Sequence, residues 1–152
     1  MRDLLRLLLV PRERLDLLGL DDEIGGALLQ AGYSEQALPY LLEMLRRSPD
    51  NAKALLAIGR IHLLAKRLPE ARQALERAMA VNPNLADGWN ELGGVETESG
   101  NFTQALRLYE KALAVQPGFP YAMLNAAQTQ ERLGNVVEAE RSGTSPQNPL
   151  PR

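Results

Sequence analysis

Residues 86–119 read ADGWNELGGVETESGNFTQALRLYEKALAVQPGF, and this stretch decides the fold. It contains two helical runs that are separated near Gly100, and the second run ends before Pro117. Proline has no backbone N–H and clashes with the preceding helical turn, so Pro117 closes the second run. A glycine suits the left-handed residue that commonly ends a helix, which is the place of Gly100. The stretch therefore predicts two antiparallel helices joined by a tight turn.

The same pattern recurs along the chain. Pro49, Pro83 and Pro117 are 34 residues apart, which divides the sequence into units 18–51, 52–85, 86–119 and an incomplete 120–152. The eighth place of each unit is small, and the twentieth is always alanine: Gly25, Gly59, Gly93 and Ala127, then Ala37, Ala71, Ala105 and Ala139. Small residues at these places let the two helices of a unit cross at close range. Gly32, Gly100 and Gly134 lie between the helices, whereas Lys66 takes that place in the second unit, so its turn is either made differently or strained.

The third unit resembles the tetratricopeptide repeat. The residues at the signature places of that family are Trp89, Leu92, Gly93, Ala105, Tyr109, Ala112 and Pro117. The second unit matches similarly, the first more loosely, and the fourth departs from the pattern after Ala139. The resemblance covers about residues 18–142. It implies an all-α solenoid of antiparallel helix pairs. The apolar run near the N-terminus predicts an extra helix before this array.

We expect the domain organisation to follow these units. Residues 1–17 are predicted to form an apolar helical segment, residues 18–142 the repeat array with a fourth unit truncated at 120–142, and residues 143–152 a disordered, proline-rich tail. The expected helix pairs are 20–31 with 34–47, 52–65 with 69–81, 86–99 with 102–115, and 120–133 with 136–142. Ser34 and Asn135 are suitable N-cap residues.

The composition argues against catalysis and against several classes of partner. Among 152 residues the net charge is −2, which gives no reason to expect nucleic acid or an anionic membrane as a partner. The absence of cysteine excludes disulfides and thiolate sites, and a single histidine excludes a multi-histidine metal site. His62 takes a place where the family usually packs an aromatic, so we interpret it as structural. We therefore expect neither an enzyme nor a bound cofactor or metal.

An apolar run near the N-terminus and groups of acidic residues could be mistaken for a targeting segment and a metal site. The apolar run from Leu4 to Val10 is too short for a signal peptide or a membrane span, and this favours the cytoplasm and no membrane partner. Glu96, Glu98 and the run Asp21–Glu23 could suggest metal binding. However, Asp21–Glu23 also suits a helix N-terminus, where negative charge meets the positive end of the helix dipole.

The resemblance implies that the first helices of successive units line a concave groove, which holds an extended peptide or a partner helix. The groove residues predicted on this basis are Lys53, Leu56, Arg60, Leu63, Asp87, Asn90, Glu91, Tyr121, Leu124, Asn125 and Gln128. The amides of Asn90, Asn125 and Gln128 can both donate to and accept from a peptide backbone.

One subclass of the family is disfavoured. Tetratricopeptide domains that hold the acidic C-termini of heat-shock chaperones use a clamp of Lys, Asn and Arg side chains. One alignment of this chain places Asp22, Gly26, Ala57, Asp87 and Glu91 at those positions, and the other places Leu56, Arg60, Glu91, Tyr121 and Asn125 there. Neither set resembles the clamp, and the first would repel a carboxylate.

The sequence therefore favours a non-catalytic scaffold for protein interactions. The alternatives are a substrate-recruiting segment of a larger enzyme, such as a glycosyltransferase, and a secretion-type chaperone. The chain ends suggest a further partner, because a stunted fourth unit would leave apolar residues under-covered. Those residues are Leu106, Tyr109, Leu113, Met123 and Leu133. Self-association through one or both ends, or docking onto a longer parent protein, would cover them.

Overall fold

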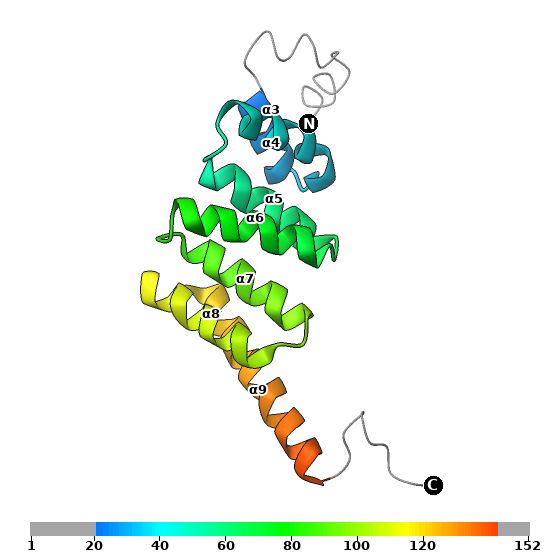
Figure 1. Ribbon diagram of the computed structural model, residues 1–152, viewed down its shortest axis with the longest axis vertical. Helices are drawn as coiled ribbons and strands as arrows, with labels where there is room; N and C mark the ends of the chain where they lie inside the picture. Colours follow the sequence, from blue (N-terminus) through cyan, green and yellow to red (C-terminus); the bar gives the residue numbers. More distant parts are fainter. Residues whose placement is uncertain (1–20, 143–152) are drawn as a thin grey trace, which may run out of the picture. The chain divides into compact units, whose positions relative to one another are not determined.

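The computed structural model describes residues 21–142, and these residues form helices and turns without a strand (Figure 1). The helices are α3 (Asp21–Gln30), α4 (Ser34–Arg47), α5 (Ala52–Leu64), α6 (Leu68–Val81), α7 (Ala86–Glu98), α8 (Phe102–Val115) and α9 (Pro120–Ser142). Pro49, Pro83 and Pro117 follow α4, α6 and α8. The prediction of an all-α array of antiparallel helix pairs is confirmed. The predicted N-terminal helical segment 1–17 and the predicted disordered tail 143–152 lie outside the described residues.

The chain divides into two compact units, with the boundary between Asn82 and Pro83. Unit 1 contains α3 to α6; in it α3 packs on α4, α5 packs on α6, and α4 also packs on α5. Unit 2 contains α7 to α9, and α8 packs on both of the others. Within each unit, short turns join consecutive helices, which therefore run in opposite directions. In unit 2 this makes α7 and α9 run in the same direction.

Glycines on the first helices let the second helices approach closely. A Cβ atom added to Gly59 would lie 2.5 Å from Cγ of Leu75, and one added to Gly93 would overlap the ring of Tyr109. Leu75 and Tyr109 are both buried, so neither side chain has room to move away. The close helix crossing that the small residues predicted is confirmed at these two places.

The turns between paired helices share one geometry. Gly32 and Gly100 have φ angles of 81° and 80°, and Lys66 has a φ of 59° at the equivalent place. The backbone N–H of Arg67 donates to the carbonyl of His62 at 2.8 Å, and the N–H of Asn101 donates to the carbonyl of Glu96 at the same distance. Lys66 therefore makes the same left-handed turn as the glycines. Of the two alternatives, the strained turn is the one observed.

The fourth unit differs from the prediction. Residues Pro120–Ser142 form one continuous helix of 23 residues, so the predicted break into 120–133 and 136–142 is wrong. Gly134 does not adopt the positive φ of Gly32 and Gly100, and Asn135 lies inside the helix instead of capping a new one. Val136 and Val137 are 41% and 47% exposed, so the residues after Gly134 have little apolar packing to gain. Continuing the helix adds one backbone hydrogen bond per residue, so the chain continues as a helix and makes no turn at Gly134.

One predicted helix cap is also wrong. Ser34 is the first residue of α4, and Tyr33 occupies the cap position without a side-chain hydrogen bond to the helix. A side chain does cap α5, because Oδ1 of Asn51 accepts from the N–H of Ala54 at 3.0 Å. The side chain of Asn51 thereby satisfies one of the free N–H groups in the first turn of α5.

Candidate functional site

The residues predicted to line a binding groove all lie on first helices, and they fall into two sets. The unit 1 surface consists of Lys53, Leu56, Arg60 and Leu63 on α5. The unit 2 surface consists of Asp87, Asn90 and Glu91 on α7 with Tyr121, Leu124, Asn125 and Gln128 on α9. The two surfaces are described separately because they belong to different compact units.

The unit 1 surface alternates cationic and apolar side chains along α5. Lys53 and Arg60 are exposed, seven residues apart, and so they lie on the same side of α5. Leu56 and Leu63 are half-buried. The helix carries no acidic residue, so these two cations dominate its charge.

The centre of the unit 2 surface is a pair of amides that joins α7 to α9. Nδ2 of Asn125 donates to Oδ1 of Asn90 at 2.9 Å. Asn90 is 8% exposed and Asn125 is half-buried, so the pair forms the floor of this surface. The amides of Asn90 and Asn125 were predicted to bind a peptide backbone. One donor and one acceptor of this pair are instead used in a hydrogen bond with each other. The bond links α7 to α9 at this surface.

Tyr109 of α8 forms a second link under the same surface. Its ring packs against Gly93, and its hydroxyl lies 2.9 Å from Oγ1 of Thr97 on α7. Burial raises the pKa of Tyr109 above 10.0, hydrogen bonds to the hydroxyls of Thr97 and Thr129 oppose that rise, and the nearby charge of Glu91 adds to it. Because Thr129 belongs to α9, the phenol connects all three helices of unit 2.

The role of Tyr109 was missed by the sequence analysis. Tyr109 was expected to be under-covered at the end of the array, but it is 2% exposed. The sequence did carry a signal for its position, because Gly93 leaves room for a large ring from the second helix. Of the other residues expected to be under-covered, Met123 is 53% exposed, and Leu106, Leu113 and Leu133 are half-buried.

Two apolar side chains stand exposed on α9 beside the amide pair. Tyr121 is 68% exposed and Leu124 is 56% exposed. The Tyr121 ring lies edge-on to that of Phe119, with 5.9 Å between the ring centroids, and Phe119 is buried in the core of unit 2. Gln128 is exposed one turn beyond Leu124. An aromatic and an aliphatic side chain on adjacent turns form a small apolar platform, which we call the Tyr121–Leu124 platform.

The helix opposite this platform is acidic. Its four acidic residues are Asp87, Glu91, Glu96 and Glu98, and it contains no Lys or Arg. Asp87 and Glu98 are exposed and Glu91 is half-buried. The unit 2 surface therefore places amides between negative charge on one side and apolar side chains on the other.

Glu96 and Trp89 belong to the packing of unit 2. Glu96 is 4% exposed, and one of its carboxylate oxygens accepts from Nδ2 of Asn101 at 2.8 Å, at the start of α8. Negative charge is favourable at that helix end. Trp89 donates from Nε1 to the carbonyl of Pro83 at 2.8 Å and packs with the ammonium of Lys111, 4.6 Å from its ring centroid. Across residues 21–142 no three His, Cys, Asp or Glu side chains are grouped as a metal site.

His62 has no polar partner at one ring nitrogen. The side chain is half-buried on α5, and Nδ1 is buried without a hydrogen bond. This environment fits the structural role that its place in the repeat predicted.

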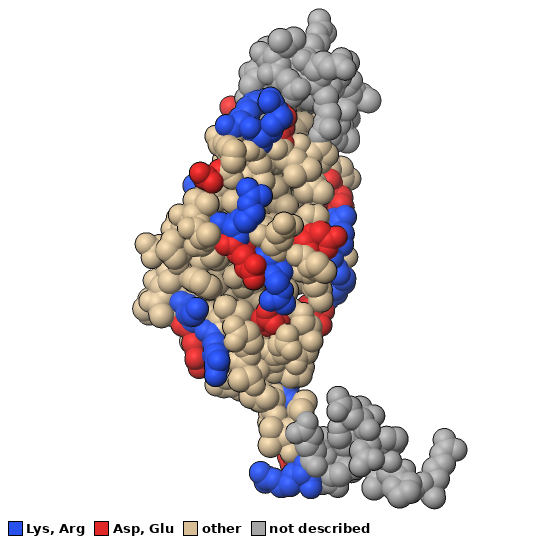
Figure 2. All heavy atoms as spheres, in the orientation of Figure 1, with Lys and Arg blue, Asp and Glu red and all other residues tan. Residues whose placement is uncertain are grey.

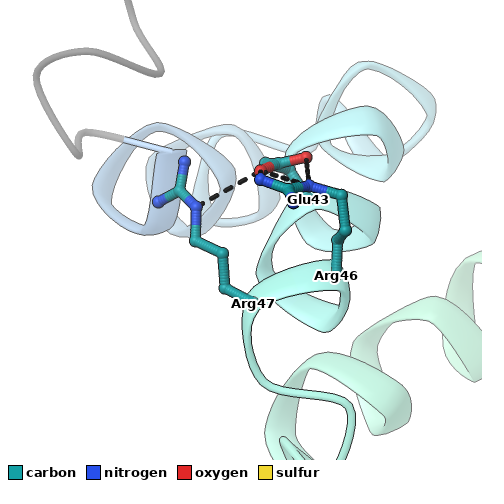
Figure 3. Close-up of polar contacts among 3 residues, drawn as sticks. All are labelled: Glu43, Arg46 and Arg47. Atoms are coloured by element: carbon teal, nitrogen blue, oxygen red, sulfur yellow. Dashed lines mark hydrogen bonds and ion pairs between the residues drawn. The ribbon is translucent and has the colours of Figure 1, made fainter.

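Charged residues elsewhere pair locally. On α4, Arg46 donates to both carboxylate oxygens of Glu43, with a shortest distance of 2.7 Å, and Arg47 donates to the same carboxylate at 3.3 Å (Figure 3). In unit 1, Nη2 of Arg67 donates to Glu35 at 2.7 Å. The face shown in Figure 2 carries positive and negative residues that are interspersed among uncharged ones. In the part of the chain that the structure describes, no helix combines the length and the apolar character that crossing a membrane requires.

The fold and its surfaces define a class of protein, the helical-hairpin repeat proteins. In this class the first helix of each pair exposes one of its sides for recognition. Comparison with known families shows which one this is. The sequence model of the family described as "Tetratricopeptide repeat" matches residues 28–90 and 96–141. The chain belongs to the tetratricopeptide repeat family.

Curated relatives are much longer proteins. The chain is 28% identical over 110 residues to the peroxisomal targeting signal receptor of Kluyveromyces lactis, a match that covers 72% of this chain and 19% of that protein. It is 30% identical over 103 residues to the cellulose synthase operon protein C of Komagataeibacter sucrofermentans, covering 64% of this chain and 8% of the relative. The chain thus spans less than a fifth of the length of each of these relatives.

Solved structures share the fold. The crystal structure of MamA superposes with a TM-score of 0.72 at 25% identity, covering 86% of this chain and 78% of that one. The first repeat domain of Spaghetti (RPAP3), bound to the HSP90 peptide SRMEEVD, superposes with a TM-score of 0.70 at 16% identity, covering 76% of this chain and 91% of that domain. At 16% identity the second likeness concerns the fold alone.

Proposed function

We propose that the chain is a non-catalytic protein-interaction module and that the unit 2 surface binds an extended peptide or a partner helix. The observation that carries this proposal is the Tyr121–Leu124 platform beside the Asn90–Asn125 bond. Two large apolar side chains are exposed at 68% and 56% next to a pair of amides held by the fold. Contacts of this kind, apolar anchors with a few fixed polar groups, are typical of recognition sites.

The hydrogen bonds between the helices of unit 2 support the proposal. The Asn90–Asn125 bond and the buried hydroxyl of Tyr109 tie α7, α8 and α9 together below the surface. A partner that binds there does not have to order the helices first, so less of its binding energy is lost to conformational entropy. Each repeat of this kind buries its apolar face by packing on neighbours, which leaves the sides of the first helices for recognition.

Similar proteins give the proposal a precedent. The Spaghetti domain holds a peptide in its solved structure, and a second domain of RPAP3 was solved in complex with the HSP70 peptide SGPTIEEVD. The curated relative from Kluyveromyces lactis is named as a receptor for a targeting signal. These are properties of those proteins, and the peptide chemistry of this chain is argued from its own residues.

The unit 1 surface is a second candidate contact for the same partner class. Its two exposed cations, Lys53 and Arg60, alternate along α5 with half-buried Leu56 and Leu63. Replacing Lys53 and Arg60 together by glutamate reverses this charge without touching the core, so it separates a contribution of unit 1 from one of unit 2.

A display library of random linear peptides, selected on the purified chain, tests the proposal. Fluorescence anisotropy of selected peptides is then measured with Leu124→Asp and with Leu42→Asp as the matched control. Leu42 is 53% exposed, close to the 56% of Leu124, but it lies on the second helix α4. We expect Leu124→Asp to weaken binding at least about tenfold and Leu42→Asp to leave it unchanged. Equal affinities for the two variants would place binding elsewhere.

A further inference from the structure

We propose that one side of α9 binds an amphipathic helix supplied by a partner protein, in the way that α6 covers α5 and α8 covers α7. Residues that recur every three or four positions share one side of a helix. On α9 these residues are Met123, Ala126, Ala127, Gln130 and Gly134, and we call this side the outer face of α9. It is separate from the unit 2 surface, to which the proposed function assigns a peptide.

Another side of α9 packs on the preceding helices as the repeat requires. Ala122 is 0% exposed and Thr129 is 2% exposed. Ala54 and Ile61 hold the same two places on α5, where they are 1% and 2% exposed in the core of unit 1. α9 therefore follows the pattern of a first helix on the side that packs against the rest of unit 2.

The outer face departs from this pattern. Met123 is 53% exposed, whereas Leu55, at the same place on α5, is 1% exposed. Ala127 is exposed, whereas Gly59 and Gly93, at the same place on α5 and α7, are buried. On α5 and α7 these places are covered by α6 and α8. The outer face thus has the positions that bind a second helix, and no helix within residues 21–142 covers them.

Open space continues along the outer face toward the end of α9. Figure 1 shows the later turns of α9 running past α8. A Cβ atom added to Gly134 would meet nothing within 4 Å. A surface hollow lies there, lined by Gln130, Leu133, Gly134, Val137, Glu138 and Arg141. From residue 123 to residue 141 a helix measures about 27 Å at 1.5 Å per residue, which is long enough for a partner of 14 residues, the length of α6 and α8.

The second helices indicate which partner fits. The buried side of α6 carries Ala71, Leu75 and Ala78, and each of the three is 0% exposed. α8 has alanines at both equivalent places and a tyrosine at the central one. Alanine lets the two helix backbones approach closely, and the central side chain fills the space beside the small residue of the first helix. The partner helix should therefore carry alanine, a large apolar residue and alanine at positions i, i+4 and i+7.

Ala127 limits the size of the central residue. It has a Cβ atom where α7 has Gly93, and a Cβ at Gly93 would overlap the ring of Tyr109. In the pair α3–α4, a Cβ atom added to Gly25 would have its nearest neighbour 3.2 Å away and would lie 3.9 Å from Cδ2 of Leu41. A partner helix that crosses at this wider spacing can place leucine over Ala127, but not tyrosine.

The probe is a fluorescein-labelled peptide with the α6 sequence, residues 68–81. A lactam bridge between side chains introduced at positions 73 and 77, which α6 exposes, keeps it helical, because a free peptide of this length is marginally helical in water. Fluorescence anisotropy measures its binding to the purified chain, and we expect saturable binding. Replacing both peptide alanines, Ala71→Glu and Ala78→Glu, should weaken it at least about tenfold.

Variants of the chain locate the binding site. Met123→Glu should weaken binding of the peptide at least about tenfold, because it places a charge on the outer face. Asn135→Glu is the matched control, since it introduces the same charge at an exposed residue of α9 about 120° around the helix from Met123. It should leave binding unchanged. Circular dichroism of each variant confirms that the helices are retained.

The size limit at Ala127 gives a second test. The peptide variant Leu75→Tyr should bind the wild-type chain about five- to tenfold more weakly than the leucine peptide. Ala127→Gly in the chain should restore binding of the tyrosine peptide, because glycine at this place accepts a tyrosine in the pair α7–α8. Damage to α9 from the glycine itself would weaken both peptides alike and would contradict the size limit.

No saturable binding of the peptide, or equal binding by Met123→Glu and Asn135→Glu, would overturn the inference. If the peptide does not bind and Met123→Glu abolishes association between copies of the chain, the outer face belongs to a second copy and the inference is wrong. These results do not depend on Leu124, so the proposed function is tested separately.

Discussion

Lys66 holds a backbone conformation that suits glycine. Within residues 21–142 it is the non-glycine residue with positive φ, at 59°, while the equivalent turns use Gly32 and Gly100. An L-residue in this region suffers a clash between its Cβ atom and the backbone, which costs about 1–2 kcal/mol. The neighbouring hydrogen bond from the Arg67 N–H to the carbonyl of His62 keeps the turn in place despite that strain.

We expect Lys66→Gly to stabilise the chain. Glycine relieves the clash but gains freedom in the unfolded state, so the net increase in the free energy of unfolding should be roughly 0.5–1 kcal/mol. Urea denaturation followed by circular dichroism measures it. Ala65→Gly is the control, because Ala65 has a φ of −80° and glycine there should destabilise. A Lys66→Gly variant less stable than wild type would contradict the strain argument.

The Glu43 carboxylate makes the stability of α4 depend on pH. The hydrogen bond from Arg46 lowers the pKa of Glu43 below 4.5, and the charges of Arg46 and Arg47 act in the same direction. Since the folded-state pKa lies below the unfolded value, this interaction stabilises the fold above pH 4.5. That stabilisation is lost as the pH falls through the folded-state pKa.

Glu43→Gln should therefore lower stability at neutral pH and have little effect in acid. The effect at neutral pH will be small, because ion pairs at the surface contribute little and are screened by salt. Urea titrations at neutral pH and well below pH 4.5 measure the difference in the free energy of unfolding between wild type and Glu43→Gln, with Glu110→Gln as the control. A difference between Glu43→Gln and wild type that persists unchanged well below pH 4.5 would exclude the ion pair as its cause.

At the scale of helices, two glycines with different surroundings should respond in opposite ways to alanine. A Cβ atom at Gly93 would overlap the Tyr109 ring, whereas one at Gly134 would meet nothing within 4 Å. We expect Gly93→Ala to lower the free energy of unfolding by about 1–3 kcal/mol, because the buried Tyr109 cannot move freely. Gly134→Ala should raise it by up to about 1 kcal/mol, since alanine favours the helix interior.

Thermal unfolding of both glycine variants, followed by circular dichroism, tests this contrast. A Gly93→Ala variant as stable as wild type would show that α8 can shift away from α7. A destabilising Gly134→Ala change would show that Gly134 is not a regular helical residue. The two results are independent, because one concerns the contact between helices and the other concerns the middle of α9.

The first three helix pairs could be predicted from the sequence because each boundary has a local chemical cause. Pro49, Pro83 and Pro117 cannot continue a helix, and Gly32 and Gly100 favour the left-handed turn. The fourth pair could not be predicted in this way. Gly134 occupies the place of a turn, but a turn there forms only if the following residues gain by packing back. Val136 and Val137 stay exposed, so α9 continues.

The candidate site was predictable as a set of positions but not as a set of contacts. The spacing of the repeat placed Asn90 and Asn125 on first helices, and the structure shows them bonded to each other. That bond depends on how far α7 lies from α9, which no local pattern encodes. The link through Tyr109 was missed for the same reason, because it involves residues from three helices.

Two of the first helices carry charge of one sign. α5 carries Lys53 and Arg60 with no acidic residue, and α7 carries four acidic residues with no Lys or Arg. The first helix of the fourth unit, α9, is mixed, with Glu131, Arg132, Glu138 and Arg141. The second helices α4 and α6 are balanced, with Glu35, Glu43, Arg46 and Arg47 on the former and Glu70, Arg72, Glu76 and Arg77 on the latter. Balanced charge suits a solvated surface, while one-sided charge favours partners of opposite sign. The one-sided charge of α5 and α7 therefore agrees with recognition by these two helices.

The end of α9 determines how the whole molecule behaves in solution. A repeat array needs a polar final face, but the second half of α9 exposes the adjacent residues Val136 at 41% and Val137 at 47%. Exposed apolar residues close together favour association between copies. We therefore expect the light-scattering mass of the wild-type chain to rise with concentration above the 16.8 kDa of one chain.

The double variant Val136→Lys, Val137→Lys should remain at 16.8 kDa over the same range. Lysine is compatible with a helix, so the variant removes the apolar face without breaking α9. Val81→Lys is the matched control, because Val81 is 42% exposed near the end of α6 and should leave the concentration dependence unchanged. If the wild-type mass stays at one chain throughout, the exposed face of α9 is insufficient to hold two copies together. If the double variant associates as the wild type does, the contact lies on another surface of the molecule.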